Sequence, residues 1–177
     1  MLTSLEPADG ETILPLAALK VRLRIETEDD DADLSRMRAQ AIDTIERYTS
    51  KALQQRQFQW LDKQFCTRMR LPMGPVESVD AISYIDSQGT DIELSAEDWY
   101  LGAGILHAAS GKSWPYASGQ DGAVRITFTA GFADVERDAP SLLLAAEMVV
   151  AAMYADRENP NMQPALNMAD RHRTPSL

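Results

Sequence analysis

The stretch APSLLLAAEMVVAAMYADRE, residues 139–158, decides the fold that we expect, because it predicts a long helix that is apolar on nearly every side. Asp138 can cap this helix and Pro140 suits its first turn. Before Asp156 the stretch contains a single charged residue, Glu147. A helix without a polar face has to be covered almost all round. It is too short and too rich in alanine to span a membrane, so we expect its cover to be protein.

Two amphipathic helices precede it and supply part of that cover. Residues 15–24 place Leu16, Leu19 and Leu23 on one helical face. Residues 31–50 carry a longer apolar stripe with charged residues on the opposite side. Two such helices and a small sheet are a thin cover for the last helix. We therefore expect a neighbouring subunit to provide the remainder.

Residues 56–131 change to the pattern of short strands. The clearest is AVRITFTAG, residues 123–131, in which Val124, Ile126 and Phe128 alternate with polar side chains. The sequence therefore predicts an α+β protein. Its core is a small helical bundle of about three main helices (15–24, 31–50, 139–158), with an antiparallel β-rich insertion (about 56–131) between the second helix and the last.

The length and composition predict a single folded domain over residues 1–158. A chain of 177 residues with 45% hydrophobic content can bury a sizeable core. Residues 159–177 contain three prolines and lose helical periodicity. We expect this C-terminal segment to be flexible, or to become ordered only on a partner.

The net charge of -10 argues against a surface that holds nucleic-acid phosphates tightly. The charge is concentrated in ETEDDDAD, residues 26–33, which contains six carboxylates. This segment lacks the glycine and glutamate positions of an EF-hand calcium loop. Acidic residues before a helix favour its positive N-terminal end, so we interpret the segment as a solvated helix entrance. A position in the lumen of an assembly is equally compatible with the residues.

No recognisable enzyme motif is present. Gly111-Lys112-Ser113 ends like a P-loop, but position 106, where the first glycine of that motif belongs, is a leucine. We interpret residues 104–119 as a surface loop pinned by Trp114. His107 and His172 lie in no nucleophile or metal motif.

Cys66 is the only cysteine, which excludes an internal disulfide and a cysteine-based zinc site, and we predict a buried thiol. We predict no catalytic residue, no cofactor and no metal site. The N-terminus has neither the basic flank nor the apolar core of a signal peptide, so we expect a soluble chain that is not exported.

Seven stretches, in this order and spacing, resemble the head-to-tail connector (adaptor) proteins of long-tailed bacteriophages, over roughly residues 14–158. They are LAALKVRLRIETEDDDADL, AIDTIERYTSKAL, LPMGPVESVDAISYIDSQG, DWYL, WP, VRITFTAGF and APSLLLAAEMVVAAMYADRE.

The resemblance implies a non-enzymatic structural protein of the virion, at the head-to-tail interface, made in the cytoplasm of the bacterial host. Members form a ring, usually of twelve subunits, that sits beneath the portal and continues the channel through which the DNA leaves. The implied partners are further copies of the chain, the portal protein, and a tail-side stopper or tail-completion protein, with no membrane and no specific DNA binding. A stopper or tail-completion protein is the alternative within this class. A nucleotide-binding enzyme using Gly111-Lys112-Ser113 is the alternative outside it.

Four residues are candidates for partner binding. In relatives the C-terminal segment often reaches the portal, and by that analogy Arg171 and Arg173, with Arg157 at the end of the last helix, are candidates for docking. Glu147 is a carboxylate inside an apolar helix, where an unpaired charge is costly. We therefore expect Glu147 to be paired in a subunit contact or to face a hydrated seam.

Overall fold

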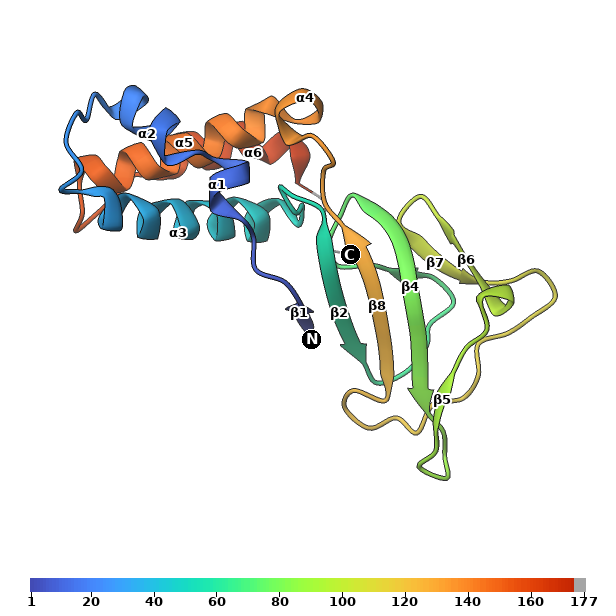
Figure 1. The fold of residues 1–177 in the computed structure, drawn as a ribbon. Coiled ribbons are helices and arrows are strands. Elements are labelled where there is room, and N and C mark those ends of the chain that lie inside the picture. Colours follow the sequence, from blue (N-terminus) through green and yellow to red (C-terminus); the bar gives the residue numbers. More distant parts are fainter. Residues whose placement is uncertain (174–177) are drawn as a thin grey trace. The chain divides into compact units, whose positions relative to one another are not determined.

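The computed structural model describes residues 1–173, which belong to two compact units (Figure 1). The β unit comprises Met1–Pro7 and Gln55–Gly131. The helical unit comprises Ala8–Gln54 and Phe132–Leu177. The expected β-rich insertion corresponds to the β unit without its first seven residues. That residues 1–158 fold as one domain stays a prediction.

The helical unit contains six helices and one 3₁₀ turn in its described part. They are α1 (Gly10–Ile13), α2 (Leu16–Leu23), α3 (Asp31–Thr49), α4 (Val135–Asp138), α5 (Pro140–Ala155), α6 (Gln163–Ala169) and η2 (Asp170–His172). Asp9 caps α1 by accepting a hydrogen bond from the backbone N–H of Glu11. Pro140 occupies the first turn of α5, as the sequence predicts.

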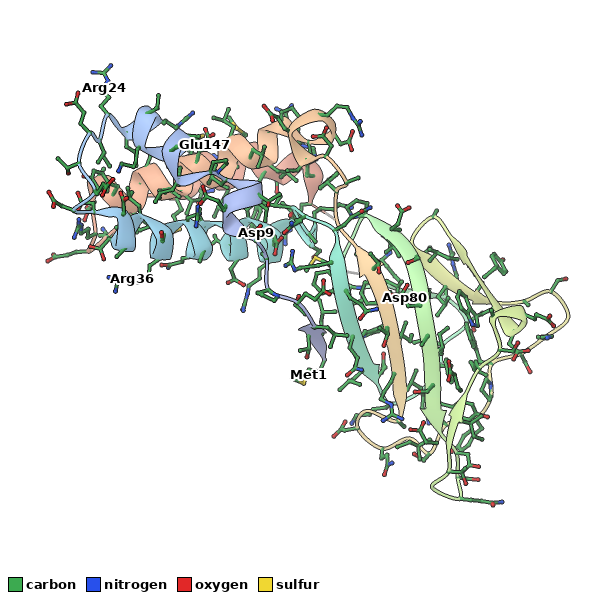
Figure 2. The ribbon with its side chains drawn as sticks, viewed as in Figure 1. Met1, Asp9, Arg24, Arg36, Asp80 and Glu147 are labelled. Carbon is green, nitrogen blue, oxygen red and sulfur yellow. The ribbon has the colours of Figure 1, made fainter. Side chains whose placement is uncertain are left out.

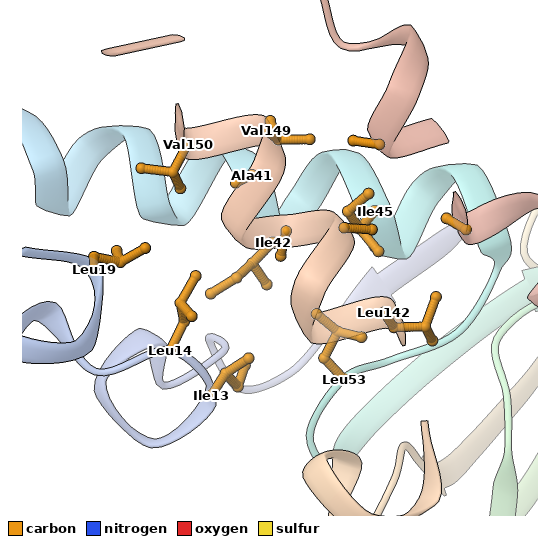
Figure 3. Packing of buried hydrophobic residues seen from close by; sticks show 14 of the residues in the cluster. Ile13, Leu14, Leu19, Ala41, Ile42, Ile45, Leu53, Leu142, Val149 and Val150 are labelled. Atoms are coloured by element: carbon orange, nitrogen blue, oxygen red, sulfur yellow. The ribbon is translucent and has the colours of Figure 1, made fainter. Parts of the chain in front are cut away.

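Helix α5 forms the centre of the helical unit. No side chain from position 141 to 154 is exposed, and Leu142, Val149 and Val150 are fully buried. Ile42 and Ile45 of α3 belong to the same hydrophobic cluster (Figure 3). The other buried members are Ile13, Leu14, Leu19, Leu34, Ala41, Leu53, Ala139, Ala145, Ala146, Met153, Ala165 and Ala169.

The segment after Asn159 differs from the sequence prediction of a flexible tail. Residues 163–169 form α6, and its Ala165 and Ala169 are buried in the same cluster as α5. Pro164 lies in the first turn of α6, where a proline is compatible with a helix. The chain itself therefore supplies part of the cover of α5 that we expected from a neighbouring subunit, while Leu143, Leu144 and Met148 remain partly exposed. Residues 174–177 lie outside the described part of the chain.

The β unit contains two antiparallel sheets. The larger sheet has the strand order β1 (Leu2–Ser4), β2 (Arg56–Asp62), β8 (Val124–Ala130), β4 (Val76–Ile85) and β5 (Asp91–Glu93). The smaller sheet has the order β3 (Met69–Arg70), β7 (Ile105–Ala108) and β6 (Trp99–Gly102), and the 3₁₀ turn η1 (Ala96–Asp98) precedes β6.

Strand β8 lies at the centre of the larger sheet, between β2 and β4. Its Val124, Ile126 and Phe128 are buried, as their alternation predicts. Phe128 is opposite Phe58 of β2, and the two rings stack with their centroids 5.8 Å apart. This pair anchors the apolar face of the sheet.

The predicted fold class is confirmed: the protein is α+β, with an antiparallel β-rich insertion between two helices of a small bundle. Among residues 1–173, no helix is both long and apolar enough to cross a membrane.

Two valines of the helical unit test how much the structure depends on the cover of α5. Val149 is fully buried, whereas Val21 on α2 is 80% exposed. We expect Val149→Ala to lower the free energy of unfolding by about 2 kcal/mol, because it removes buried methyl groups and leaves a cavity. Val21→Ala should change it by less than about 0.5 kcal/mol. Urea denaturation of both variants measures these values, and equal effects would contradict the described core.

Candidate interaction surfaces

Glu147 is paired within its own chain. Its carboxylate lies 2.6 Å from the guanidinium of Arg22, which α2 carries. Figure 2 shows Glu147 among the helices of the helical unit. The sequence predicts pairing in a subunit contact or a position at a hydrated seam, whereas the partner that the structure shows belongs to the same chain. Its predicted place in a subunit contact stays a prediction.

Arg157 closes a small network at the C-terminal end of α5. Its guanidinium lies 3.2 Å from Asp33 and 3.4 Å from Asp30. The Tyr154 hydroxyl donates a hydrogen bond of 2.9 Å to Asp30, and this bond is the main reason why the pKa of Tyr154 is raised. The network ties the end of α5 to the start of α3. A partner that binds Arg157 has to compete with these two carboxylates.

The acidic segment 26–33 divides into two parts. Asp30, Asp31 and Asp33 form ion pairs with Arg157, Lys20 and Arg36 respectively. The side chains of Glu26, Glu28 and Asp29 are exposed and form no ion pair with any described residue. The first part stabilises the entrance to α3, and the second part is free for contacts outside the chain.

The η2 turn holds the C-terminal part of the described chain on the helices. Tyr48 of α3 donates a hydrogen bond of 2.9 Å to Asp170, and the guanidinium of Arg173 lies 5.4 Å from the centre of the Tyr48 ring. His172 shares a hydrogen bond of 2.8 Å with the Ser141 hydroxyl at the start of α5. Arg171 is exposed and forms no ion pair with a described residue.

The two arginines of this turn thus differ in their surroundings. Arg173 rests on an aromatic ring, while the guanidinium of Arg171 is available to a partner. The contact between Tyr48 and Asp170 could not be predicted from the sequence, since the two residues are far apart along the chain and no local pattern connects them.

The β unit carries a cavity between aromatic side chains. Phe65 and Trp114 stack with ring centroids 4.8 Å apart, and Tyr100 stacks on His107 with centroids 5.0 Å apart. All four line a cavity of about 500 Å³. Trp114 therefore holds the connection after β7 against Phe65, but the predicted loop over residues 104–119 is wrong at Ile105–Ala108, which form β7. The prediction of a buried thiol is wrong, because Cys66 lies at the rim of this cavity and is exposed.

Gly111-Lys112-Ser113 does not form a P-loop. No helix follows Ser113 before strand β8, so the helix N-terminus that holds a phosphate in that motif is missing here. The Lys112 ammonium instead donates a hydrogen bond of 2.6 Å to Asp98 in η1. This bond lowers the pKa of Asp98 and raises the pKa of Lys112. The loop is a surface turn anchored by an ion pair.

Several titratable side chains of residues 1–173 form ion pairs, and these pairs occur in both units. Within these residues, no group of three or more His, Cys, Asp and Glu side chains is arranged to hold a metal ion.

Comparisons with known proteins agree with this description. Residues 14–93 match the sequence model of the phage gp6-like head-tail connector proteins. The chain is 30% identical to a chain in the neck of an empty gene transfer agent (GTA) particle computed with C6 symmetry, with a TM-score of 0.80 over 100% of this chain and 97% of that one. A chain in the virion of the native GTA particle gives the same values.

A third similar chain comes from an assembly that was computed with a different symmetry. The chain is 29% identical to a chain in the neck of the native GTA particle computed with C12 symmetry, with a TM-score of 0.78 over 100% of this chain and 97% of that one. None of the curated proteins compared with the chain matches it.

A match over the whole length of both chains, together with the α+β fold, defines the class: the protein is a structural connector. Within this class, the chain belongs to the head-tail connector family. The resemblance seen in the sequence is thereby confirmed. The roles of Arg157, Arg171, Arg173 and Glu147 in binding partners stay predictions.

The His172 contact predicts a specific dependence of stability on pH. Burial, and then the charges of Arg171 and Lys51, lower the pKa of His172 from its ordinary value of 6.5. As pH falls below this value, the unfolded chain therefore binds the proton before the folded chain does, and the free energy of unfolding decreases.

His172→Gln keeps an acceptor for Ser141 and cannot titrate in this range, so we expect its stability to decrease less steeply below about pH 6.5. Urea denaturation of both proteins across a pH series measures the difference. The unaltered protein and the variant both contain His107, so a difference between their profiles reports on position 172. Parallel profiles would show that His172 titrates alike in the folded and unfolded states.

Proposed function

We propose that the protein forms a closed ring in the virion, at the head-to-tail interface, beneath the portal. The ring joins the capsid to the tail and continues the channel through which DNA leaves. The observation that carries this proposal is the full-length likeness to a chain from the neck of a GTA particle, with 97% of that chain covered at 30% identity.

The ring is supported by the symmetry of the assemblies in which the similar chains occur. Two of the neck structures were computed with C6 and C12 symmetry. Rings of identical copies need a heterologous contact, in which two different surfaces of each copy meet and the rotation closes. Twelve copies, the usual number for the family that the sequence resembles, are compatible with both symmetries.

The channel is supported by charge. A passage that lets DNA slide must not hold phosphates tightly, and a chain with a net charge of -10 repels them. DNA therefore passes through the ring without specific binding. The carboxylates of the ring would act as a repulsive wall, whichever surface lines the lumen.

The portal on one side, and a stopper or tail-completion protein on the other, are the partners that this position requires. Of the four candidate residues, Arg171 is the most suitable for binding the portal, because its guanidinium is exposed and forms no ion pair with a described residue. Arg173 can leave the Tyr48 ring, since a cation–π contact at an exposed site is weak. Arg157 and Glu147 would first have to release their partners in the chain.

Assembly on particles that lack this chain tests the proposal. We expect the purified chain to be a monomer or weak oligomer in native mass spectrometry. When such particles are added, we expect a ring of many copies, visible by cryo-electron microscopy at the portal vertex. Particles without a portal are the control and should bind no ring. A chain that stays monomeric and never joins a particle would contradict the proposal.

A further inference from the structure

We infer that, in the proposed ring, Arg68 and Arg70 in the β unit of one copy bind the acidic side chains of Glu26, Glu28 and Asp29 in the helical unit of the next copy. This inference rests on the proposed function, because it assigns the two surfaces of the heterologous contact. It names the partner as a second copy of this chain.

The first surface is a basic segment in an acidic unit. The β unit has more Asp and Glu than Lys and Arg, yet residues 63–70 contain three basic residues and no acidic one. Lys63 pairs with Asp121 at 3.0 Å. Arg68 and Arg70 are exposed and form no ion pair with a described residue. Two guanidiniums therefore remain available two positions apart on the chain.

The position of these arginines suits a contact between proteins. Arg70 lies on β3, an edge strand that pairs only with β7 in the smaller sheet. The chain just before them, Phe65 to Thr67, lines the aromatic cavity of about 500 Å³, and Tyr100 at the same cavity is 52% exposed. Exposed Tyr, Trp and Arg side chains are enriched in the cores of protein interfaces.

The second surface is the free part of the acidic segment. Three carboxylates within four residues, Glu26, Glu28 and Asp29, are exposed and have no cationic partner among the described residues. They lie in the connection between α2 and α3, directly after Arg24, which projects away from the helices in Figure 2. The turn therefore presents its carboxylates to the outside of the helical unit.

Charge complementarity connects the two surfaces. In a ring of identical copies, each contact joins the basic surface of one copy to the acidic surface of the next. Every basic surface and every acidic surface therefore has a partner when the ring closes. Opposite charges also steer copies together and fix the register of the contact, while like charges facing each other disfavour wrong arrangements. Phosphates of DNA are the other possible ligand of the arginines. The net charge of the chain makes them the weaker choice.

Charge reversal tests the contact, with ring formation on portal-bearing particles as the measurement. Arg68→Glu with Arg70→Glu reverses the basic surface, and Glu28→Lys with Asp29→Lys reverses the acidic one. We expect each double variant to raise the concentration for half-maximal ring formation at least about tenfold. All four side chains are exposed, so thermal unfolding should show folded variants in each case.

The decisive result is whether combining the two charge reversals restores ring formation. The chain with all four substitutions should form rings at a concentration within about threefold of the unaltered chain, because every contact again joins opposite charges. An equimolar mixture of the two double variants should also form rings, in which the variants alternate. Arg47→Glu with Arg137→Glu is the matched control, since it changes the net charge by the same amount as the arginine double variant at exposed positions outside both surfaces, and it should leave ring formation unchanged.

Each other outcome overturns the inference. If no variant affects rings that the unaltered chain forms, the contact lies elsewhere and the proposed function stands. If the fourfold variant is not restored and the arginine variant loses affinity for DNA, the arginines bind phosphates. An equal loss in the Arg47 and Arg137 control would indicate an effect of net charge alone. If the unaltered chain forms no ring, the proposed function fails and the inference fails with it.

Discussion

The structure depends on the need to cover α5 on every side. The middle of this helix carries almost no polar side chains. Exposing its apolar surface to water would cost roughly 25 cal/mol for each Å². Helices α3 and α6 meet that need directly, and the residues around Leu14 and Leu19 complete it (Figure 3). The neighbours that cover α5 come from segments both before and after the β unit.

Small side chains make this arrangement possible. Ala145 and Ala146 of α5 and Ala165 and Ala169 of α6 are buried, so the helices can approach closely without leaving cavities. Glu147 is the one acidic residue of α5, and its carboxylate is paired with the guanidinium of Arg22 at 2.6 Å. This pair is partly exposed, so it removes the cost of an isolated charge and adds little stability of its own.

Sequence reasoning succeeded where one periodic pattern extends over several turns or strand positions. The stripe of α3 and the alternation in β8 are such patterns, and they were enough to predict an α+β fold. It failed for α6 and β1, which are short and are held by tertiary contacts. Pro160 and Pro164 read as helix breakers, although a proline in the first turn is compatible with α6. The burial of Cys66 was predicted from residue type, and residue type carries no information on the loop around it.

The candidate surfaces were less predictable because they depend on pairing between distant residues. That Glu147 needs a cation follows from its apolar surroundings, but Arg22 could not be chosen from among the cations of the chain. Likewise, residues 26–33 look uniformly acidic in the sequence. Only the structure separates Asp30, Asp31 and Asp33, which are paired, from the carboxylates that remain free. Local composition shows where charge is abundant, and the fold decides which part of it is available.

Because the chain itself covers most of α5, this helix offers little apolar surface to the subunit contacts of the proposed ring. The large apolar side chains exposed in the described residues are Met1, Leu5, Val21, Tyr100 and Tyr116, which are scattered over both units. In the proposed ring, a copy that buries its own core would need no partner to shield that core before assembly. In the proposed ring, contacts made mainly from charged and aromatic side chains would give specificity and register with modest affinity for each pair, and closure of the ring would multiply that affinity.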